Sequence, residues 1–336
     1  MTSHSLKIGA PIVVVVDLTA EAGDTVLAAA ALARGLDSKL VLVHAFEHPF
    51  ARLLKAIVPT SLIRPDALLR AEEDKFMADS ARLEDLRHAA GAVPSEAKLV
   101  TGRRTQAILK EVARTQAALI VVGGPGDSRG VLLEGLTTAS GLAFASSVPV
   151  LVIPHGKTIN SEKPRIMIAD DLRDTSLPAV AAGLELALAW PAAEVLHVHV
   201  NTVLRETFVT AMDHALLASS SGDKVSSRFL YETCEQYFRD KLAARGRPVK
   251  LRLQQRGSTI DERIVAGEAD DEIEREAIRF RADLLVVGRH SDFHAGSVRL
   301  GRMPFRTMMA LGMPVLIVPD APLLESTEAR LVTDMD

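Results

Sequence analysis

Hydrophobic and polar positions follow two alternating patterns along the chain. Short continuous apolar runs such as Pro11–Val16 and Leu119–Val122 indicate strands buried on both faces, which is typical of a parallel sheet. Ala- and Leu-rich stretches with helical spacing, such as residues 24–36 and 105–115, separate these runs. The alternation predicts right-handed crossovers and a doubly wound α/β fold.

The whole pattern occurs twice. The run Pro149–Pro154 returns as Pro314–Pro319, and Ala118–Gly123 returns as Asp283–Gly288, both 165 positions later. Earlier landmarks are separated by only 154 or 155 positions, so the second copy has gained ten residues. We place the extra residues near Gln254–Glu262 and expect a longer third strand or a small hairpin there. A regular internal repeat of this kind indicates a duplicated domain.

The joint between the two copies is a polar segment. Residues Gly156–Lys163 contain Gly, Ser and Asn and end at Pro164, as expected of a linker. We therefore divide the chain into a first domain, 1–158, and a second domain, 159–336.

Composition narrows the class of protein. The 336 residues carry a net charge of −4, which argues against a dedicated nucleic-acid binder. Cys234 is the single cysteine, which excludes an internal disulfide framework and a Cys-cluster metal site. No apolar run approaches the roughly 20 residues of a membrane span, and the N-terminus lacks a signal-peptide pattern. We expect a soluble protein of a reducing cytoplasm, without membrane insertion.

Candidate ligand-binding residues follow the first and fourth strands of each copy. Ligands of doubly wound sheets bind beyond the carboxyl ends of the strands, where the strand order reverses. Asp17 and the pair Asp170-Asp171 follow the first strands, and Gly123–Gly130 and Gly288–His294 follow the fourth. The glycine-rich loop suits a phosphate cradle, because glycine lets main-chain N–H groups turn toward an anion. A flexible strand-to-helix turn is the alternative explanation.

Both halves resemble the universal stress protein family, and the chain resembles its tandem two-domain type. The matching residues in the first half are Val13–Asp17 with Thr19 and Glu21, Val43–Ala45, Gly102, Leu119–Gly123 and Pro149–Pro154, and those in the second are Asp171, His199-Val200, Gly267, Asp283–Gly288 and Pro314–Pro319. The resemblance implies a Rossmann-like, five-stranded parallel sheet in the order 3-2-1-4-5 in each half. It also implies a pseudo-two-fold axis between the halves, as in the dimers of the family.

Many members of that family bind ATP through Gly-x-x-Gly, nine further residues, and then Gly-Ser or Gly-Thr. In the first half Gly123 and Gly126 match, but Leu136 stands at the later glycine position. Gly135 comes one residue early, and Thr137 supplies a hydroxyl only if the loop shifts. In the second half Gly288 and Gly301 match, whereas Ser291 and Arg302 replace the second glycine and the small hydroxyl residue.

The resemblance also assigns roles for ATP and Mg²⁺ in the first half. Asp17 would lie near the ribose or the metal, the main chain of Ala45 at the adenine, and Gly123, Gly126 and Gly135 at the phosphates. The corresponding residues of the second half are Asp171, Val200, Gly288 and Gly301.

A second group of polar residues follows the fourth strand of the second copy. His290, Asp292 and His294 are two positions apart in what we expect to be one loop, across the crevice from Asp171. Imidazole with carboxylate suits a divalent metal or an acid–base pair. Two solvated histidines in a polar loop are the simpler explanation. We interpret His44 and His199 as structural hydrogen-bonding residues, and Cys234 as an inert buried thiol.

The first functional hypothesis is a non-enzymatic cytoplasmic stress-response protein that senses a small-molecule ligand, with ATP in the first domain, or binds a protein partner or a second copy of itself. A metal- or nucleotide-dependent hydrolase using Asp171, His290 and Asp292 is the second. A carrier of an apolar or anionic small molecule is the third. The motif Gly-x-x-x-x-Gly-Lys-Ser/Thr does not occur, so the chain is not a P-loop nucleotide hydrolase.

Overall fold

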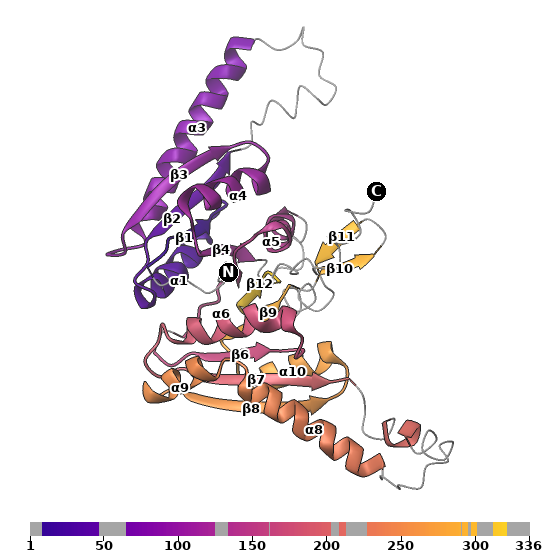
Figure 1. Cartoon of the computed structure of the whole chain (residues 1–336). Helices are drawn as coiled ribbons and strands as arrows, with labels where there is room; N and C mark the ends of the chain where they lie inside the picture. The colour runs from indigo at the N-terminus through magenta and orange to yellow at the C-terminus, as the bar shows by residue number, and fades with distance from the viewer. Residues whose placement is uncertain are drawn as a thin grey trace, which may run out of the picture.

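A computed structural model shows two five-stranded α/β units (Figure 1). The structure describes residues 9–46, 65–124, 134–160, 162–202, 208–212, 227–289, 291–294, 297–300 and 312–320. Residues 126, 290 and 301 lie outside these ranges, and so do predictions that depend on their positions.

The first unit has the predicted strand order. Its parallel strands run β3-β2-β1-β4-β5 across the sheet, with bounds β1 Ile12–Val15, β2 Leu40–Phe46, β3 Ser95–Thr101, β4 Leu119–Gly124 and β5 Val150–Pro154. Helices α1 (Ala22–Gly35) and α3 (Pro65–His88) bury apolar side chains against one face of the sheet. Helices α4 (Arg104–Thr115) and α5 (Glu134–Ala145) cover the other face.

The second unit repeats this order as β8-β7-β6-β9-β12. Its strands are β6 (Arg165–Ala169), β7 (Glu194–Asn201), β8 (Thr259–Ala266), β9 (Leu284–Gly288) and β12 (Val315–Val318). Its helices are a short 3₁₀ turn at Asp174–Ser176, α6 (Leu177–Ala187), α8 (Ser227–Ala244), α9 (Arg247–Gln255) and α10 (Ala269–Phe280). The order 3-2-1-4-5 is therefore confirmed in both units.

The sequence predicts two separate five-stranded sheets. In the structure the two sheets join edge to edge into one ten-stranded sheet. Strand β5 pairs antiparallel with β12, and Leu151 lies opposite Leu316, its own repeat equivalent. This register places a local two-fold axis between the two leucines. Pairing satisfies the main-chain N–H and C=O groups of two apolar edge strands. Left unpaired, these groups would be available for pairing with another chain, which leads to aggregation.

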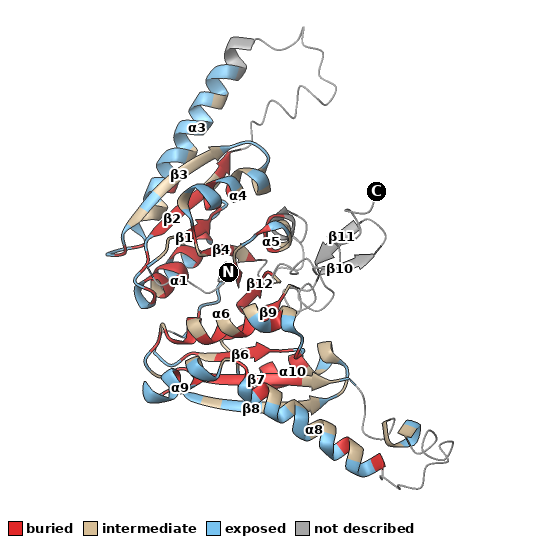
Figure 2. Cartoon of the chain, in the orientation of Figure 1, coloured by how far each residue is buried: buried red, intermediate tan, exposed pale blue. Residues whose placement is uncertain are grey.

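The core forms one continuous layer on each face of the joined sheet. Figure 2 shows the buried residues concentrated along the strands and on the inner sides of the helices. Leu151 and Leu316 belong to the same layer, so the two-fold axis is normal to the sheet. The carboxyl ends of the strands of the two units consequently point to opposite edges of the sheet.

The ten inserted residues do not form a longer strand or a hairpin at 254–262. They form α9, an additional helix between α8 and β8. Gly246 adopts a left-handed φ of 66° after α8, and a proline in the first turn then starts α9. The glycine and the proline are thus the sequence signals that could have located the insertion.

Residues 291–294 are not part of a loop. Strand β10 (Ser291–His294) pairs antiparallel with β11 (Ser297–Leu300), with Asp292 opposite Arg299 and His294 opposite Ser297. Asp292 and His294 are therefore two positions apart on one strand of this hairpin. His290 is outside the described residues, so the proposed metal or acid–base group stays a prediction.

Candidate functional site

The turns after β1 and β6 have the same geometry. Leu18 and Leu172 adopt left-handed φ angles of 60° and 61°. Asp17 Oδ1 accepts a hydrogen bond from the main-chain N–H of Thr19 at 3.1 Å, and Asp171 Oδ1 accepts one from Arg173 at 2.9 Å. The duplicated unit therefore presents an exposed aspartate at the carboxyl end of its first strand in both domains.

A histidine from the neighbouring strand supports each turn. His44 Nδ1 donates to the carbonyl oxygen of Val16 at 2.8 Å, and His199 Nδ1 donates to that of Asp170 at 2.8 Å. A carbonyl oxygen only accepts, so Nδ1 carries the proton in both residues. The prediction that these histidines are structural is confirmed.

The main chain of β2 extends past the carboxyl end of β1. Val16 N–H donates to Val43 O at 3.0 Å, which is the last bond between β1 and β2. Main-chain groups alternate sides along a strand, so those of Ala45 also face the β1 side, past its end. Asp170 and Val198 make the equivalent bond in the second domain, at 2.9 Å, and Val200 takes the place of Ala45.

The other predicted residues of the first domain lie on two elements, β4 and α5. Gly123 is in β4, and Gly135 and Thr137 are in the first two turns of α5. A Cβ atom on Gly123 would lie 3.2 Å from Thr25 Oγ1 and 3.6 Å from His155 Cε1. Packing inside the protein is thus sufficient to explain a glycine at 123.

The amino end of α4 adds a basic group that the sequence analysis did not include in the site. Gly102 follows β3 with φ 127°, which favours glycine, and the next two residues are Arg103 and Arg104. Arg104 Nη1 donates to Thr138 Oγ1 of α5 at 3.4 Å, so its guanidinium lies between the two helices. The first turn of α4 has no acidic residue, which leaves the positive end of its dipole available to an anion.

The equivalent surface of the second domain has the opposite charge. Gly267, with φ 152°, is followed by Glu268, and the first turn of α10 contains Asp270, Asp271 and Glu272. A Cβ atom on Gly267 would lie 2.6 Å from Glu272 Oε1. The same atom on Gly102 would meet only Ala107 Cβ, at 3.9 Å, within the described chain. A carboxylate therefore covers in the second domain the surface that is open in the first.

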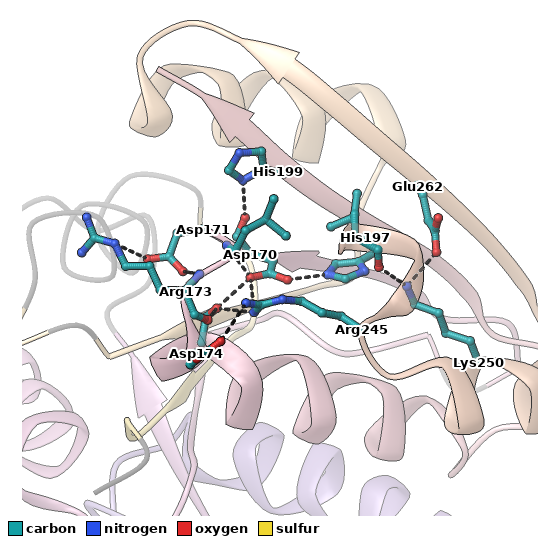
Figure 3. Close-up of polar contacts among 12 residues, drawn as sticks. Asp170, Asp171, Arg173, Asp174, His197, His199, Arg245, Lys250 and Glu262 are labelled. Carbon is teal, nitrogen blue, oxygen red and sulfur yellow. Dashed lines mark hydrogen bonds and ion pairs between the residues drawn. The ribbon is translucent and has the colours of Figure 1, made fainter. Parts of the chain in front are cut away.

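Under the second-domain turn lies a buried polar network that the sequence analysis missed (Figure 3). Asp170 Oδ1 accepts hydrogen bonds from Ser176 Oγ at 2.7 Å and from Arg245 Nη1 at 3.0 Å. Its Oδ2 accepts one from His197 Nε2 at 3.0 Å. Ser176 is the N-cap residue of α6, but its hydroxyl bonds to Asp170 and to the Arg173 carbonyl rather than capping the helix.

Burial and pairing set the ionisation of this network. Burial alone would raise the pKa of Asp170, but the hydrogen bonds from His197 and Ser176 and the charge of Arg245 hold it below its ordinary value. Burial lowers the pKa of His197 more than the bond to Asp170 raises it. His197 is consequently neutral at pH 7, with its proton on Nε2.

Lys250 extends the network toward the sheet edge. Its Nζ donates to Glu262 Oε1 at 2.6 Å and to the carbonyl oxygen of Leu242 at 2.8 Å. Burial lowers the pKa of Lys250, and the hydrogen bond from Lys250 to Glu262 opposes that change. Polar contacts thus tie α8 and α9 to β6 and β8.

The first domain has apolar side chains at the corresponding positions. Repeat spacing aligns Asp170 with Val16, Ser176 with Ala22 and His197 with Leu42, and all three first-domain residues are buried. Polar residues at repeat positions with apolar counterparts were the sequence signal that could have found the network.

The described residues contain a further cleft, but no group of residues placed to bind a metal. A cleft of about 290 Å³ lies at the amino ends of β9 and β12, lined mainly by apolar side chains with Lys157, Arg281 and Asp283. It lies at the edge of the sheet opposite to the carboxyl ends of the second unit's strands, away from Asp171, Val200 and Gly288. No group of three His, Cys, Asp or Glu residues is placed to hold a metal in the part that the structure describes. Across those same residues, no helix combines the length and apolarity needed to cross a membrane.

The fold defines a tandem, doubly wound α/β protein whose two units have a Rossmann-like strand order. The sequence model of the Universal stress protein family matches residues 10–154 and again 164–319. The chain belongs to the universal stress protein family, as a tandem two-domain member. A comparison with curated proteins gives no match.

Two solved structures share this architecture. A universal stress protein from Archaeoglobus fulgidus DSM 4304 has a TM-score of 0.62 at 15% identity, over 95% of this chain and 99% of that one. A functionally unknown protein from Pseudomonas aeruginosa PAO1 has a TM-score of 0.54 at 17% identity, over 94% of each chain. At these identities the likeness concerns the fold.

Proposed function

We propose that this universal stress protein is a non-enzymatic cytoplasmic sensor that binds ATP with Mg²⁺ in its first domain. The observation that carries the proposal is the contrast between Gly102 and Gly267. The first glycine is open and followed by two arginines, and the second is covered by the Glu272 carboxylate. Family membership supports the stress-response role, and the single cysteine suits a reducing compartment.

The electrostatics of the first crevice favour a polyphosphate. Arg103, Arg104 and the positive end of α4 lie on the carboxyl edge of the sheet, on the same face as the first turns of α5. An anion of several charges gains from all of these groups, and arginine matches phosphate oxygens with two donors. In the second domain the equivalent surface, at the amino end of α10, is acidic. We therefore propose that Asp171, Val200 and Gly288 do not hold a nucleotide there.

The remaining parts of ATP have partners on the first domain in this proposal. The exposed carboxylate of Asp17 would bind the ribose hydroxyls or Mg²⁺, and Mg²⁺ would neutralise part of the phosphate charge. The main-chain groups of Ala45 would bind the adenine edge. Gly123 and the amino end of α5, with Gly135 and Thr137, would face the phosphates. Changes in bound ATP would then be signalled through a protein partner.

Calorimetric titration of the purified protein with ATP and Mg²⁺ tests the proposal. We expect one saturable site per chain and no release of phosphate over hours. No heat at millimolar ATP, together with no nucleotide in the purified protein by mass spectrometry, would contradict it. Phosphate release at a steady rate would favour a hydrolase instead. An apolar or anionic molecule found by mass spectrometry in place of ATP would favour a carrier.

A further inference from the structure

Arg289 connects the second domain to a helix of the first. It follows directly on Gly288 at the carboxyl end of β9, and its main-chain N–H donates to Val318 O at 2.7 Å. Its Nη1 donates to the carbonyl oxygen of Phe144 at 2.7 Å and to that of Ser146 at 2.8 Å. These carbonyls are at the carboxyl end of α5, where helical carbonyls lack partners within the helix.

Helix α5 reaches from one crevice to the other domain. Its twelve residues span about 18 Å, since an α-helix rises about 1.5 Å per residue. Its amino end follows β4, at the carboxyl edge of the first sheet, where Gly135 and Thr137 lie. Its carboxyl end is at the opposite edge, because β5 and β12 pair antiparallel and bring the end of β9 there.

At this repeat position the second domain donates a side chain to the first, and the first domain donates none in return. Repeat spacing aligns Arg289 with Gly124, which has no side chain to donate. A Cβ atom at Gly124 would lie 2.9 Å from Val152 Cγ1, so packing excludes a larger residue there. The first domain therefore has no equivalent arginine at this position with which to hold the second.

We infer that Arg289 is a positioning residue for the first crevice, which fixes α5 from the second domain and so sets how tightly the first domain binds a nucleotide. The nucleotide part rests on the proposed function. A guanidinium at the carboxyl end of a helix satisfies its last carbonyls and favours its negative dipole end. Removing it frees the end of α5 that leads into β5.

The chain contains a matched control for this contact. Arg256 Nη1 donates to the carbonyl oxygen of Leu188 at 2.8 Å, at the carboxyl end of α6. This contact has the same chemistry but stays within the second domain. Arg256→Met therefore reproduces the loss of one arginine at a helix end without touching α5.

Hydrogen exchange and ATP titration of the full chain test the inference. In Arg289→Met we expect faster amide exchange confined to α5 and β5, and an ATP dissociation constant raised about fivefold, the ratio that a modest coupling gives. Arg289→Lys, which keeps one donor, falls between wild type and Arg289→Met. Arg256→Met leaves α5 exchange and ATP affinity at the wild-type values.

The other possible results contradict either the role of Arg289 or the proposed binding of ATP. Unchanged α5 exchange in Arg289→Met, acceleration spread evenly over the first domain, or unchanged ATP affinity despite a loosened α5 would overturn the inference. If the wild-type chain does not bind ATP, the proposed function fails. In that case the exchange comparison alone still decides whether Arg289 fixes α5.

Discussion

Gly35, the last residue of α1, lies directly against Ala189 of the second domain. A Cβ atom on Gly35 would lie 2.6 Å from the Ala189 carbonyl oxygen and 2.9 Å from its Cβ. The two domains thus approach each other through main chain at this point, besides pairing at β5 and β12. Together with the shared core layers, this contact predicts that the two domains unfold as one unit.

We predict opposite effects for two glycine-to-alanine changes in the same helix. Gly35→Ala forces main chain apart at the domain junction and destabilises the protein by about 1–3 kcal/mol, as overpacking does. Gly23→Ala, with nothing within 4 Å of its Cβ in the described chain, stabilises it by about 0.5–1 kcal/mol through helix propensity. Urea unfolding followed by Trp190 fluorescence and circular dichroism measures both. Equal effects, or different midpoints for the two signals, would contradict this picture of the junction.

His197 predicts a pH dependence of stability. Burial lowers its pKa in the folded protein, so below about pH 6.5 the unfolded chain takes up a proton that the folded chain does not. The free energy of unfolding must therefore decrease as pH falls below that point. His197→Gln keeps a donor to Asp170 but removes the titration. We expect its profile to be flatter by up to about 1.4 kcal/mol per pH unit.

Unfolding in urea at pH 7.5, 6.5 and 5.5 measures this difference. His88→Gln, at an exposed position at the end of α3, is the control, and its profile should follow that of wild type. Parallel profiles for wild type and His197→Gln would show that the buried network does not respond to pH.

Arg103 predicts a local electrostatic effect on ATP binding. We expect Arg103→Gln to weaken ATP binding about tenfold, which corresponds to roughly 1.4 kcal/mol for a charged contact to phosphate. Lys110→Gln removes the same charge from the exposed side of the same helix and should change the affinity less than twofold. Calorimetry at constant ionic strength compares them. If both variants lose the same ATP affinity, the cause is the change in net charge and not a contact of Arg103 with phosphate.

Most of the fold followed from repeated local patterns. The apolar runs that end at Pro154 and Pro319 locate β5 and β12. The pairing of Leu151 with Leu316 was not predictable from those patterns, because an apolar strand reads the same at an edge and in the middle of a sheet.

The candidate site was predictable to a smaller extent. Asp17 and Ala45 could be placed from their strands, since the carboxyl ends of parallel strands share an edge. The contacts of Arg289 with α5 depend on how two domains pack, which no local pattern records. Asp170 was passed over in favour of Asp171, because a run of two aspartates does not show which one turns inward.

We propose that the surface beside Gly102 binds ATP and that the surface beside Gly267 does not. Exchanging the two equivalent residues tests it: Ala107→Glu places in the first domain the carboxylate that Glu272 supplies in the second. Calorimetric titration with ATP and Mg²⁺ should show binding weakened at least tenfold in Ala107→Glu and unchanged in Glu272→Ala. Unchanged binding in Ala107→Glu, or binding lost in Glu272→Ala, would contradict the account.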